Sequence, residues 1–281
     1  MNLQDRHTRT RTSLNVAGID IGFSTRRPSA GIGFLVGGQL DLKNCFGVDA
    51  CKQLAQGGPY DMIAIDGPVM PSGQNSETIR NVERVFCKGP FQRRCKPGMS
   101  HVRGTGMRLR EQAGKAADIL SDTTSLFRVN LSFPQVRQGA IIEAFPNAFL
   151  GVCLDDDVYA TMPTLRRGEK FGWLYGQWKA RALVRHLHGL TAAEKTTLQG
   201  RFDEERHHER QAALVCILTA LLTARGQFTA VGDTEGGWFF LPPWRCWKEW
   251  ARDAVVVGIR ELNRGGAGIR LLQNGITIKD I

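Results

Sequence analysis

The run Met62–Ile65 is the feature that most restricts what this chain can fold into, because it is continuously apolar and ends at an acid, Asp66. Such a run suits a strand that is buried on both faces, as in the middle of an α/β sheet. The preceding segments 15–23, 29–38 and 39–48 read as short strands with glycine-rich turns between them. They are close enough in sequence to form an antiparallel meander. The chain therefore predicts a meander joined to a buried central strand.

Further strands and helices alternate along the rest of the chain. Apolar spacing and glycine stops predict helices over 48–58, 106–120, 170–200, 203–226 and 246–266, a strand over 138–146, and a strand or extended segment over 236–244. A meander followed by strand–helix alternation gives a mixed sheet flanked by helices. This order is that of the RNase H-like fold, so we expect an α/β protein with a mixed five-stranded sheet.

The composition is that of an ordinary globular protein, since 42% of the 281 residues are hydrophobic and 23% are charged. Because no internal repeat and no linker stands out, we expect one domain over residues 16–281 after a flexible basic N-terminus, 1–15. Two elaborations are expected: a long basic loop over 72–106 and a C-terminal extension over 244–281. The sequence indicates no oligomeric state.

The net charge of +10 favours a polyanionic partner, and nucleic acid is the first candidate. The seven cysteines are odd in number and form no CxxC pair, so neither a disulfide framework nor a zinc ribbon is indicated. Residues 1–15 lack the apolar core of a secretory signal, and no run approaches the roughly 18 apolar residues of a membrane span. We expect a cytoplasmic protein that does not enter the membrane.

Acids close three of the predicted strands. Asp20 follows "VAGI", Asp66 follows "MIAI" and Glu143 follows "AII". Ligands of open α/β sheets bind at the carboxyl ends of the strands, and clustered carboxylates imply a cation, for which oxygen ligands favour Mg²⁺ or Mn²⁺. Glu209, before the apolar stripe of helix 203–226, is the candidate fourth ligand, with Glu205 as its rival. The alternative is that each acid merely caps a turn or helix.

A basic stretch lies between residues 80 and 110 and contains one acid, Glu83. We predict that it binds nucleic acid through Arg80, Arg84, Lys88, Arg93, Arg94, Lys96 and Arg110. Phe86 and Phe91, interleaved with these cations, offer stacking surfaces for unpaired bases. A solvated surface loop is the alternative. His208 is a candidate proton shuttle or phosphate contact, with an ordinary surface histidine as the alternative.

Six motifs resemble a known family in content and order. They are "GIDIGFS", "IAIDGPVMP", "RVFCKGPFQRRCKPG", "IIEAFPNAFLGVCL", "HERQAALVCILTALLTA" and "EGGWFFLPP", spread over residues 16–243. The chain is similar to the predicted RNase H-like nucleases catalogued as domain of unknown function 429. The resemblance implies a catalytic and metal-binding acidic site at Asp20, Asp66, Glu143 and Glu209, and motif arginines at Arg80 and Arg110. It departs at Gln211, where members often carry an acid.

The leading hypothesis is therefore a hydrolase, a metal-dependent nuclease in which acids place two cations about 4 Å apart for phosphodiester cleavage. Two alternatives stay open. A non-catalytic nucleic-acid-binding protein would keep the fold without full metal ligation. An ATP-using phosphotransferase of the actin-like and sugar-kinase class would use Ser24 and Thr25, which follow Asp20, as phosphate contacts. The sequence shows no second phosphate-binding loop of the kind that this class requires.

Overall fold

A computed structural model describes residues 13–70, 78–95, 99–101, 103–128, 139–166, 168–274 and 276–277. The strands among these residues are β1 (Val16–Asp20), β2 (Ala30–Val36), β3 (Gln39–Cys45), β4 (Met62–Asp66), β5 (Phe127–Arg128), β6 (Ala140–Ala144), β7 (Thr229–Asp233), β8 (Gly237–Leu241), β9 (Arg270–Gln273) and β10 (Ile276–Thr277). They form one mixed sheet in the order β10-β9-β7-β8-β6-β4-β1-β2-β3, and β5 pairs with β6 beside this path.

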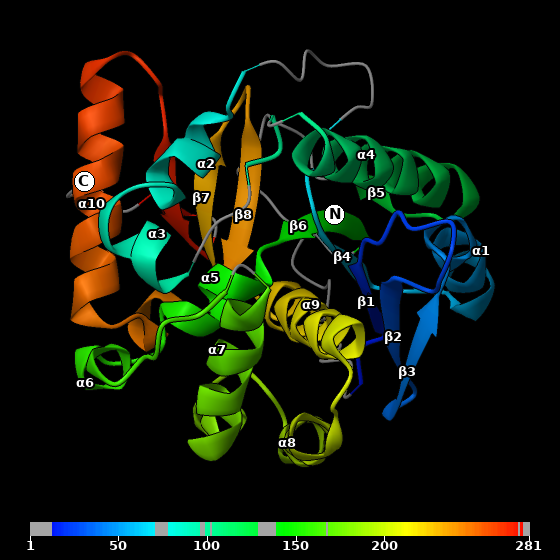
Figure 1. Cartoon of the computed structure of the whole chain (residues 1–281). Helices are drawn as coiled ribbons and strands as arrows, with labels where there is room; N and C mark the ends of the chain where they lie inside the picture. The colour runs from blue at the N-terminus through cyan, green and yellow to red at the C-terminus, as the bar shows by residue number, and fades with distance from the viewer. Residues whose placement is uncertain are drawn as a thin grey trace, which may run out of the picture.

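Helices flank this sheet (Figure 1). In chain order they are α1 (Gly47–Gly57), α2 (Asn81–Phe86), α3 (Gly89–Arg94), α4 (Thr105–Thr123), α5 (Pro146–Gly151), α6 (Asp156–Ala160), α7 (Glu169–Ala180), the 3₁₀ helix η1 (Leu183–His186), α8 (Ala192–Glu204), α9 (His208–Ala224), the 3₁₀ helix η2 (Trp244–Cys246) and α10 (Glu249–Arg264). No helix among the described residues is both long and apolar enough to span a bilayer.

The predicted α/β architecture is confirmed, but the sheet is larger than the five strands that we expected. The meander pairs antiparallel as β1-β2-β3, and β4 pairs parallel with β1 and β6. The additional strands are β5, β7, β9 and β10. β5 and β10 have only two residues each, too few to show a periodic pattern, and β7 and β9 are strands because they pair with each other. Through β9, which pairs with β7, the predicted C-terminal extension joins the sheet.

Two helical predictions also need correction. Part of the predicted loop 72–106 is helical, because α2 and α3 bury Val82, Val85, Phe86 and Phe91 against the core. The predicted helix 170–200 is two helices separated by η1. The second helix begins where Thr191 and Glu194 form a capping box, which satisfies two backbone N–H groups at a new helix start.

Close packing between α9 and the meander is what brings the ends of these elements together. In Figure 1, α9 crosses one face of β1, β2 and β4, whereas α1 and α4 lie on the other face. A Cβ atom on Gly18 would lie only 2.5 Å from the Ala213 carbonyl oxygen and 2.6 Å from the Ile217 amide nitrogen. A Cβ atom on Gly31 would overlap the Glu209 carbonyl oxygen. Only glycine lets the helix backbone approach the strands this closely.

We predict that Gly18→Ala destabilises the fold by about 1–3 kcal/mol, since the new methyl group pushes against the backbone of α9. The free energy of unfolding in urea measures the effect. Gly200→Ala is the matched control, because a Cβ atom in the middle of α8 meets nothing within 4 Å. That substitution should stabilise the protein by about 0.5–1 kcal/mol through helix propensity. Equal unfolding midpoints for Gly18→Ala and the wild type would contradict the close-packing argument.

Candidate active site at the carboxyl ends of β1 and β4

Asp20 and Asp66 lie directly opposite each other in the parallel pair formed by β1 and β4. Paired residues of neighbouring strands project from the same face, and the strands are about 4.8 Å apart. The face is the one covered by α9, because Cys216 of α9 lies beside both carboxylates and its thiol donates to the Ile19 carbonyl oxygen at 3.4 Å. Both aspartates are partly exposed. The fold thus places two carboxylates together at one edge of the sheet.

Glu209 approaches these aspartates from the first turn of α9. Gly31 is the strand partner of Asp20, and it is also the residue against which the Glu209 backbone packs. Glu209 is close enough to Asp20 to raise its pKa. The packing of α9 thus places Glu209 near Asp20, and the assignment of Asp20, Asp66 and Glu209 to one metal site stays a prediction.

The electrostatics of the pair are unfavourable for charge. Burial raises the pKa of Asp20 well above its usual value, and the neighbouring Asp66 and Glu209 add to the effect. Burial, together with Glu143, raises the pKa of Asp66 to about 7. Every one of these causes raises the pKa of the aspartate that it acts on. A carboxylate pair of this kind gains from a cation that removes the repulsion.

Glu143 lies near the aspartates, but on the opposite face of the sheet. Its strand partner is Ile65, one residue before Asp66, and side chains alternate between faces along a strand. Ile141 and Ile65, which share this face, belong to the core under α1 and α4. The one-residue offset in register thus separates Glu143 from the two aspartates that we predicted as its partners in metal binding.

Arg80 holds Glu143 through both carboxylate oxygens, at 2.7 and 2.8 Å. The same guanidinium donates to Glu83 at 2.9 and 3.1 Å and to the Gly236 carbonyl oxygen at 3.1 Å. The side chains of Arg80, Glu83 and Glu143 are only 2–3% exposed. Burial disfavours charge on Arg80, but Glu143 and Glu83 outweigh it and raise its pKa. Burial raises the pKa of Glu143, and Arg80 opposes that rise.

The Arg80–Glu83–Glu143 network was not predicted from the sequence. We predicted Arg80 as a nucleic-acid contact, yet it is 5% exposed and acts as a bridge between two buried glutamates. The spacing of Arg80 and Glu83 in the sequence could have indicated their ion pair. They are three residues apart at the start of a helix, and such residues are neighbours on a helical surface. Arg110 lies beside this network, and burial, followed by the nearby Arg80, lowers its pKa.

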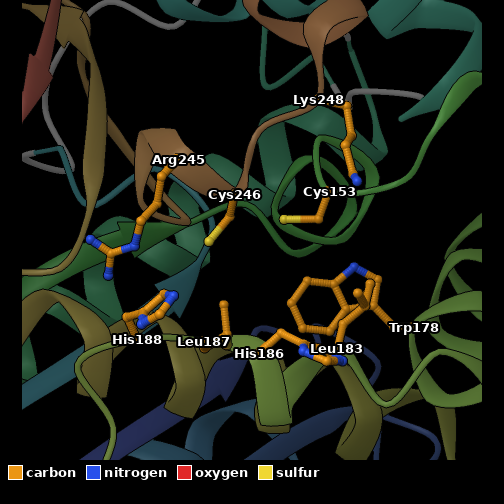
Figure 2. A pocket seen from close by; sticks show the side chains of 9 residues that line it. All are labelled: Cys153, Trp178, Leu183, His186, Leu187, His188, Arg245, Cys246 and Lys248. Carbon is orange, nitrogen blue, oxygen red and sulfur yellow. The ribbon is translucent and has the colours of Figure 1, made fainter.

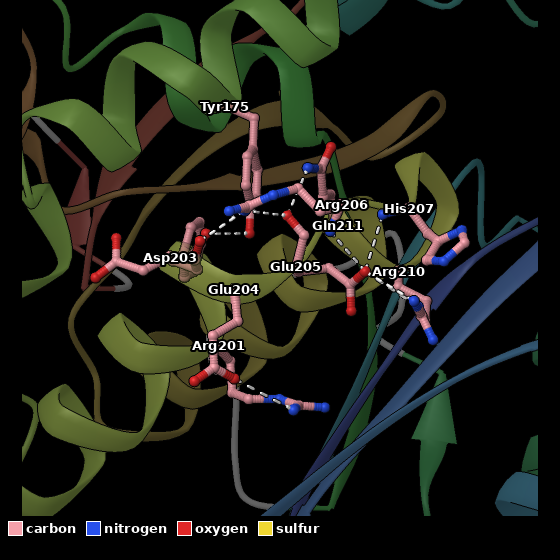
Figure 3. Close-up of polar contacts among 10 residues, drawn as sticks. Tyr175, Arg201, Asp203, Glu204, Glu205, Arg206, His207, Arg210 and Gln211 are labelled. Carbon is pink, nitrogen blue, oxygen red and sulfur yellow. Dashed lines mark hydrogen bonds and ion pairs between the residues drawn. The ribbon is translucent and has the colours of Figure 1, made fainter.

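Glu205, the rival fourth ligand, is the C-cap residue of α8, in the turn that leads into α9 (Figure 3). Its carboxylate accepts from the backbone N–H groups of Arg206 and His207 at 2.8 and 2.9 Å and forms an ion pair with Arg210 at 3.0 Å. Gln211 donates its side-chain amide to the Glu205 carbonyl oxygen at 3.1 Å. Glu205 therefore has a structural role, which favours Glu209 as the acid of this helix.

The other predicted nucleic-acid contacts differ in their exposure. Arg84, Lys88 and Arg93 are exposed on α2, α3 and the turn between them. Arg94 lies over the rings of Tyr159 and Trp250, with its guanidinium carbon 4.9 and 4.3 Å from the ring centroids, and pairs with Asp156 at 2.5 Å. Lys96 lies outside the described residues.

The two loop aromatics are not available to unpaired bases. Phe86 and Phe91 are 0% and 1% exposed, and their ring centroids lie 4.7 Å apart within the core. The prediction that they stack on nucleic acid is therefore wrong, because apolar burial under α10 takes their surface. His208 is exposed and sets its ring edge-on to Phe171, with centroids 4.9 Å apart; its proposed proton-shuttle role stays a prediction.

Among the described residues, no group of three or more His, Cys, Asp and Glu side chains is arranged to hold a metal ion. The four predicted ligands form a chain of electrostatic neighbours, Glu209 to Asp20 to Asp66 to Glu143, rather than one converging cluster. Comparison with known proteins adds no further constraint: no family model matches the chain, and no curated protein or solved structure matches it either.

We predict that Arg80→Met lowers the free energy of unfolding by about 3–5 kcal/mol, because it leaves two buried glutamates without their cation. Chemical denaturation at pH 7 measures this change. Arg84→Met, four residues further along and exposed, is the matched control and should cost less than about 0.5 kcal/mol. Similar losses in the free energy of unfolding for the two variants would contradict a stabilising role of the buried network.

The raised pKa of Asp66 predicts a pH dependence in metal-free protein. An unfolded aspartate titrates near 3.9, whereas folded Asp66 titrates at about 7. This group therefore favours the folded state fully below about pH 4, and its contribution is lost as the pH rises through 7. In EDTA, Asp66→Asn should be more stable than the wild type at pH 8, and the difference should shrink toward pH 4.

Thermal melting across pH 4–8 tests this expectation. Asp122→Asn, which changes an exposed aspartate near the end of α4, should leave the pH profile unchanged and serves as the control. A difference between Asp66→Asn and wild type that stays constant over the whole range would contradict the electrostatic account of Asp66.

Proposed function

We propose that this protein is a metal-dependent nuclease with an RNase H-like core. The observation that carries the proposal is the register pairing of Asp20 with Asp66, next to Glu209 in the first turn of α9. Two strand ends and one helix start thereby supply three carboxylates to one edge of the sheet. Membership of the RNase H-like nuclease family that the motifs resemble is part of the same proposal.

The strand order is the second support. The portion β3-β2-β1-β4-β6 contains an antiparallel meander followed by two parallel strands, which is compatible with an RNase H-like core. Fold alone does not determine function. The proposal therefore depends on the carboxylates at the strand ends and not on the strand order.

The residues fit a hard divalent cation. Asp20, Asp66 and Glu209 offer only oxygen donors, the chemistry that Mg²⁺ and Mn²⁺ prefer. The raised pKa of Asp20 reflects burial first and then repulsion from Asp66 and Glu209, which a cation would relieve. When bound, such a cation supplies charge neutralisation for a phosphodiester and a lowered pKa for an attacking water. Glu143 fits the ligand role less well, because both its oxygens accept from Arg80. We assign it instead to positioning Arg80.

A polar cleft of about 600 Å³ offers a path for the substrate backbone. Met70, four residues after Asp66, lines it together with Asn81, Arg84 and Arg110. Exposed cations along α2 and α3 continue outward from it, and such side chains neutralise phosphates without reading base sequence. These positions support nucleic acid as the polyanion that the net charge of +10 favours.

A non-catalytic nucleic-acid-binding protein is the second candidate. Its support is the engagement of Glu143 with Arg80 and the lack, within the described part of the chain, of three side chains arranged around one metal position. The phosphotransferase alternative has weaker support. The hydroxyl oxygen of Ser24 accepts from the backbone N–H groups of Arg26 and Arg27 at 3.2 and 3.4 Å, as a turn residue does.

We predict that purified protein cleaves nucleic acid in Mg²⁺ or Mn²⁺ and that Asp20→Asn lowers the rate by at least about 100-fold, as expected when a preorganised charge at the reaction centre is removed. Single-stranded, duplex and branched DNA and RNA are incubated separately with each protein and resolved by gel electrophoresis. Asp66→Asn should show the same loss. Asp41→Asn, an exposed acid on β3, is the matched control and should cleave like the wild type.

Four outcomes separate the candidates. Equal cleavage by the wild type and Asp20→Asn would reject the site, and cleavage that persists in EDTA would reject the metal. If no substrate is cleaved while wild type and Asp20→Asn both bind nucleic acid with a steep salt dependence, the non-catalytic reading holds. Micromolar binding of ATP with Mg²⁺, measured by calorimetry, would favour the phosphotransferase.

A further inference from the structure

A cavity of about 540 Å³ lies between η1 and the segment around η2 (Figure 2). Its walls come from distant parts of the chain: Cys153 follows α5, Trp178 belongs to α7, and Arg245 and Cys246 belong to η2. This volume is within the range of about 300–1,000 Å³ that is typical of small-molecule sites. None of its lining residues belongs to the proposed nuclease site.

The floor of this cavity is apolar and buried. Trp178, Leu187 and Cys153 are 1%, 3% and 5% exposed. The Trp178 indole N–H donates to the Leu150 carbonyl oxygen at 2.7 Å, so its polar atom is satisfied and the ring offers the cavity an apolar surface. Burial raises the pKa of both Cys153 and Cys246, which keeps the two thiols neutral. An apolar group of moderate size would be removed from water here, which favours its binding.

The mouth of the cavity is cationic. Arg245, His186 and His188 are exposed, and Lys248 is half-buried. Figure 2 shows Arg245 and His188 at the same end of the cavity, on opposite walls. The nine side chains that line the cavity in the described structure include no aspartate or glutamate. Lys248 pairs with Asp155, which lies outside the lining, at 2.9 Å.

Arg245 is held in a position from which it can bind an anionic group at this mouth. Its guanidinium donates to the Gln227 side-chain oxygen at 2.5 Å, a neutral partner that leaves the charge of the arginine uncompensated. A guanidinium recognises carboxylate, sulfonate and phosphate oxygens through paired N–H donors. A cationic mouth above an apolar floor matches a molecule with the opposite arrangement of an anionic head and an apolar body.

We propose that this cavity binds a small organic anion, with its acidic head group between Arg245 and His188 and its aromatic or aliphatic body against Trp178 and Leu187. The site is independent of the nuclease proposal, because it shares no residue with the acids at the strand ends or with the cleft beside Arg80. Its occupant is a small molecule rather than a nucleic acid, since only the mouth is polar and the floor is closed.

Two dyes that differ in charge test the proposal. 8-Anilinonaphthalene-1-sulfonate carries an anionic head on an apolar body, and N-phenyl-1-naphthylamine carries the same rings without the sulfonate. Fluorescence titration at physiological salt should show saturable binding of the sulfonate at one site. Arg245→Gln should weaken that binding about fivefold, the effect of losing one partly exposed ionic contact, and should leave binding of the uncharged dye unchanged. Arg264→Gln, an exposed arginine at the end of α10, is the matched control.

A second variant tests the cavity itself. Cys246→Phe places a ring in the space above Trp178 and should weaken binding of both dyes, with circular dichroism confirming that the variant is folded. If Arg245→Gln binds the sulfonate as the wild type does, the anionic head is not recognised here and the proposal fails. Full binding of both dyes to folded Cys246→Phe would also overturn it. Nucleic-acid cleavage should be unchanged in both variants, so this result is separate from that of the nuclease test.

Discussion

The contact between the α9 backbone and the glycines of β1 and β2 is the constraint on which the rest of the candidate site depends. A methyl group at Gly18 or Gly31 would overlap the helix backbone, so the helix backbone lies directly against these two glycines. Interiors are packed densely, and such a contact tolerates little displacement. Glu209, whose backbone packs against Gly31, is therefore held beside Asp20. The geometry of the proposed metal site follows from backbone packing more than from hydrogen bonds between its acids.

Charge at this edge of the sheet is arranged differently on its two faces. On the α9 face, burial raises the cost of ionising both Asp20 and Asp66; Asp66 and Glu209 add to it for Asp20, and Glu143 adds to it for Asp66. On the opposite face, Arg80 supplies a cation from within the chain to Glu83 and Glu143. Buried charges persist when they are paired and hydrogen-bonded. The protein thus compensates one acidic group internally, and we propose that a divalent ion compensates the other.

Much of the fold was predictable where local pattern and final environment agree. The apolar run ending at Asp66 predicted a buried strand, and the glycine-rich meander predicted antiparallel pairing; both are present. Prediction failed for β7, β9 and β10, because their strand character comes from pairing with each other and with β8. It failed for Phe86 and Phe91 because a basic local sequence conceals their burial in the core. The cationic cavity was not predictable, since its walls are far apart in sequence.

The sequence by itself determined which residues end the central strands, since an acid that closes an apolar run emerges at a sheet edge wherever the strand lies. It also determined the excess of positive charge and hence the favoured class of partner. Only the tertiary structure decided which acids share a face. The register of β4 with β1 aligns Asp66 with Asp20, whereas its register with β6 is offset by one residue and turns Glu143 away toward Arg80. Side chains alternate along a strand, so a shift of one residue reverses the face, and register depends on partners that local sequence does not reveal.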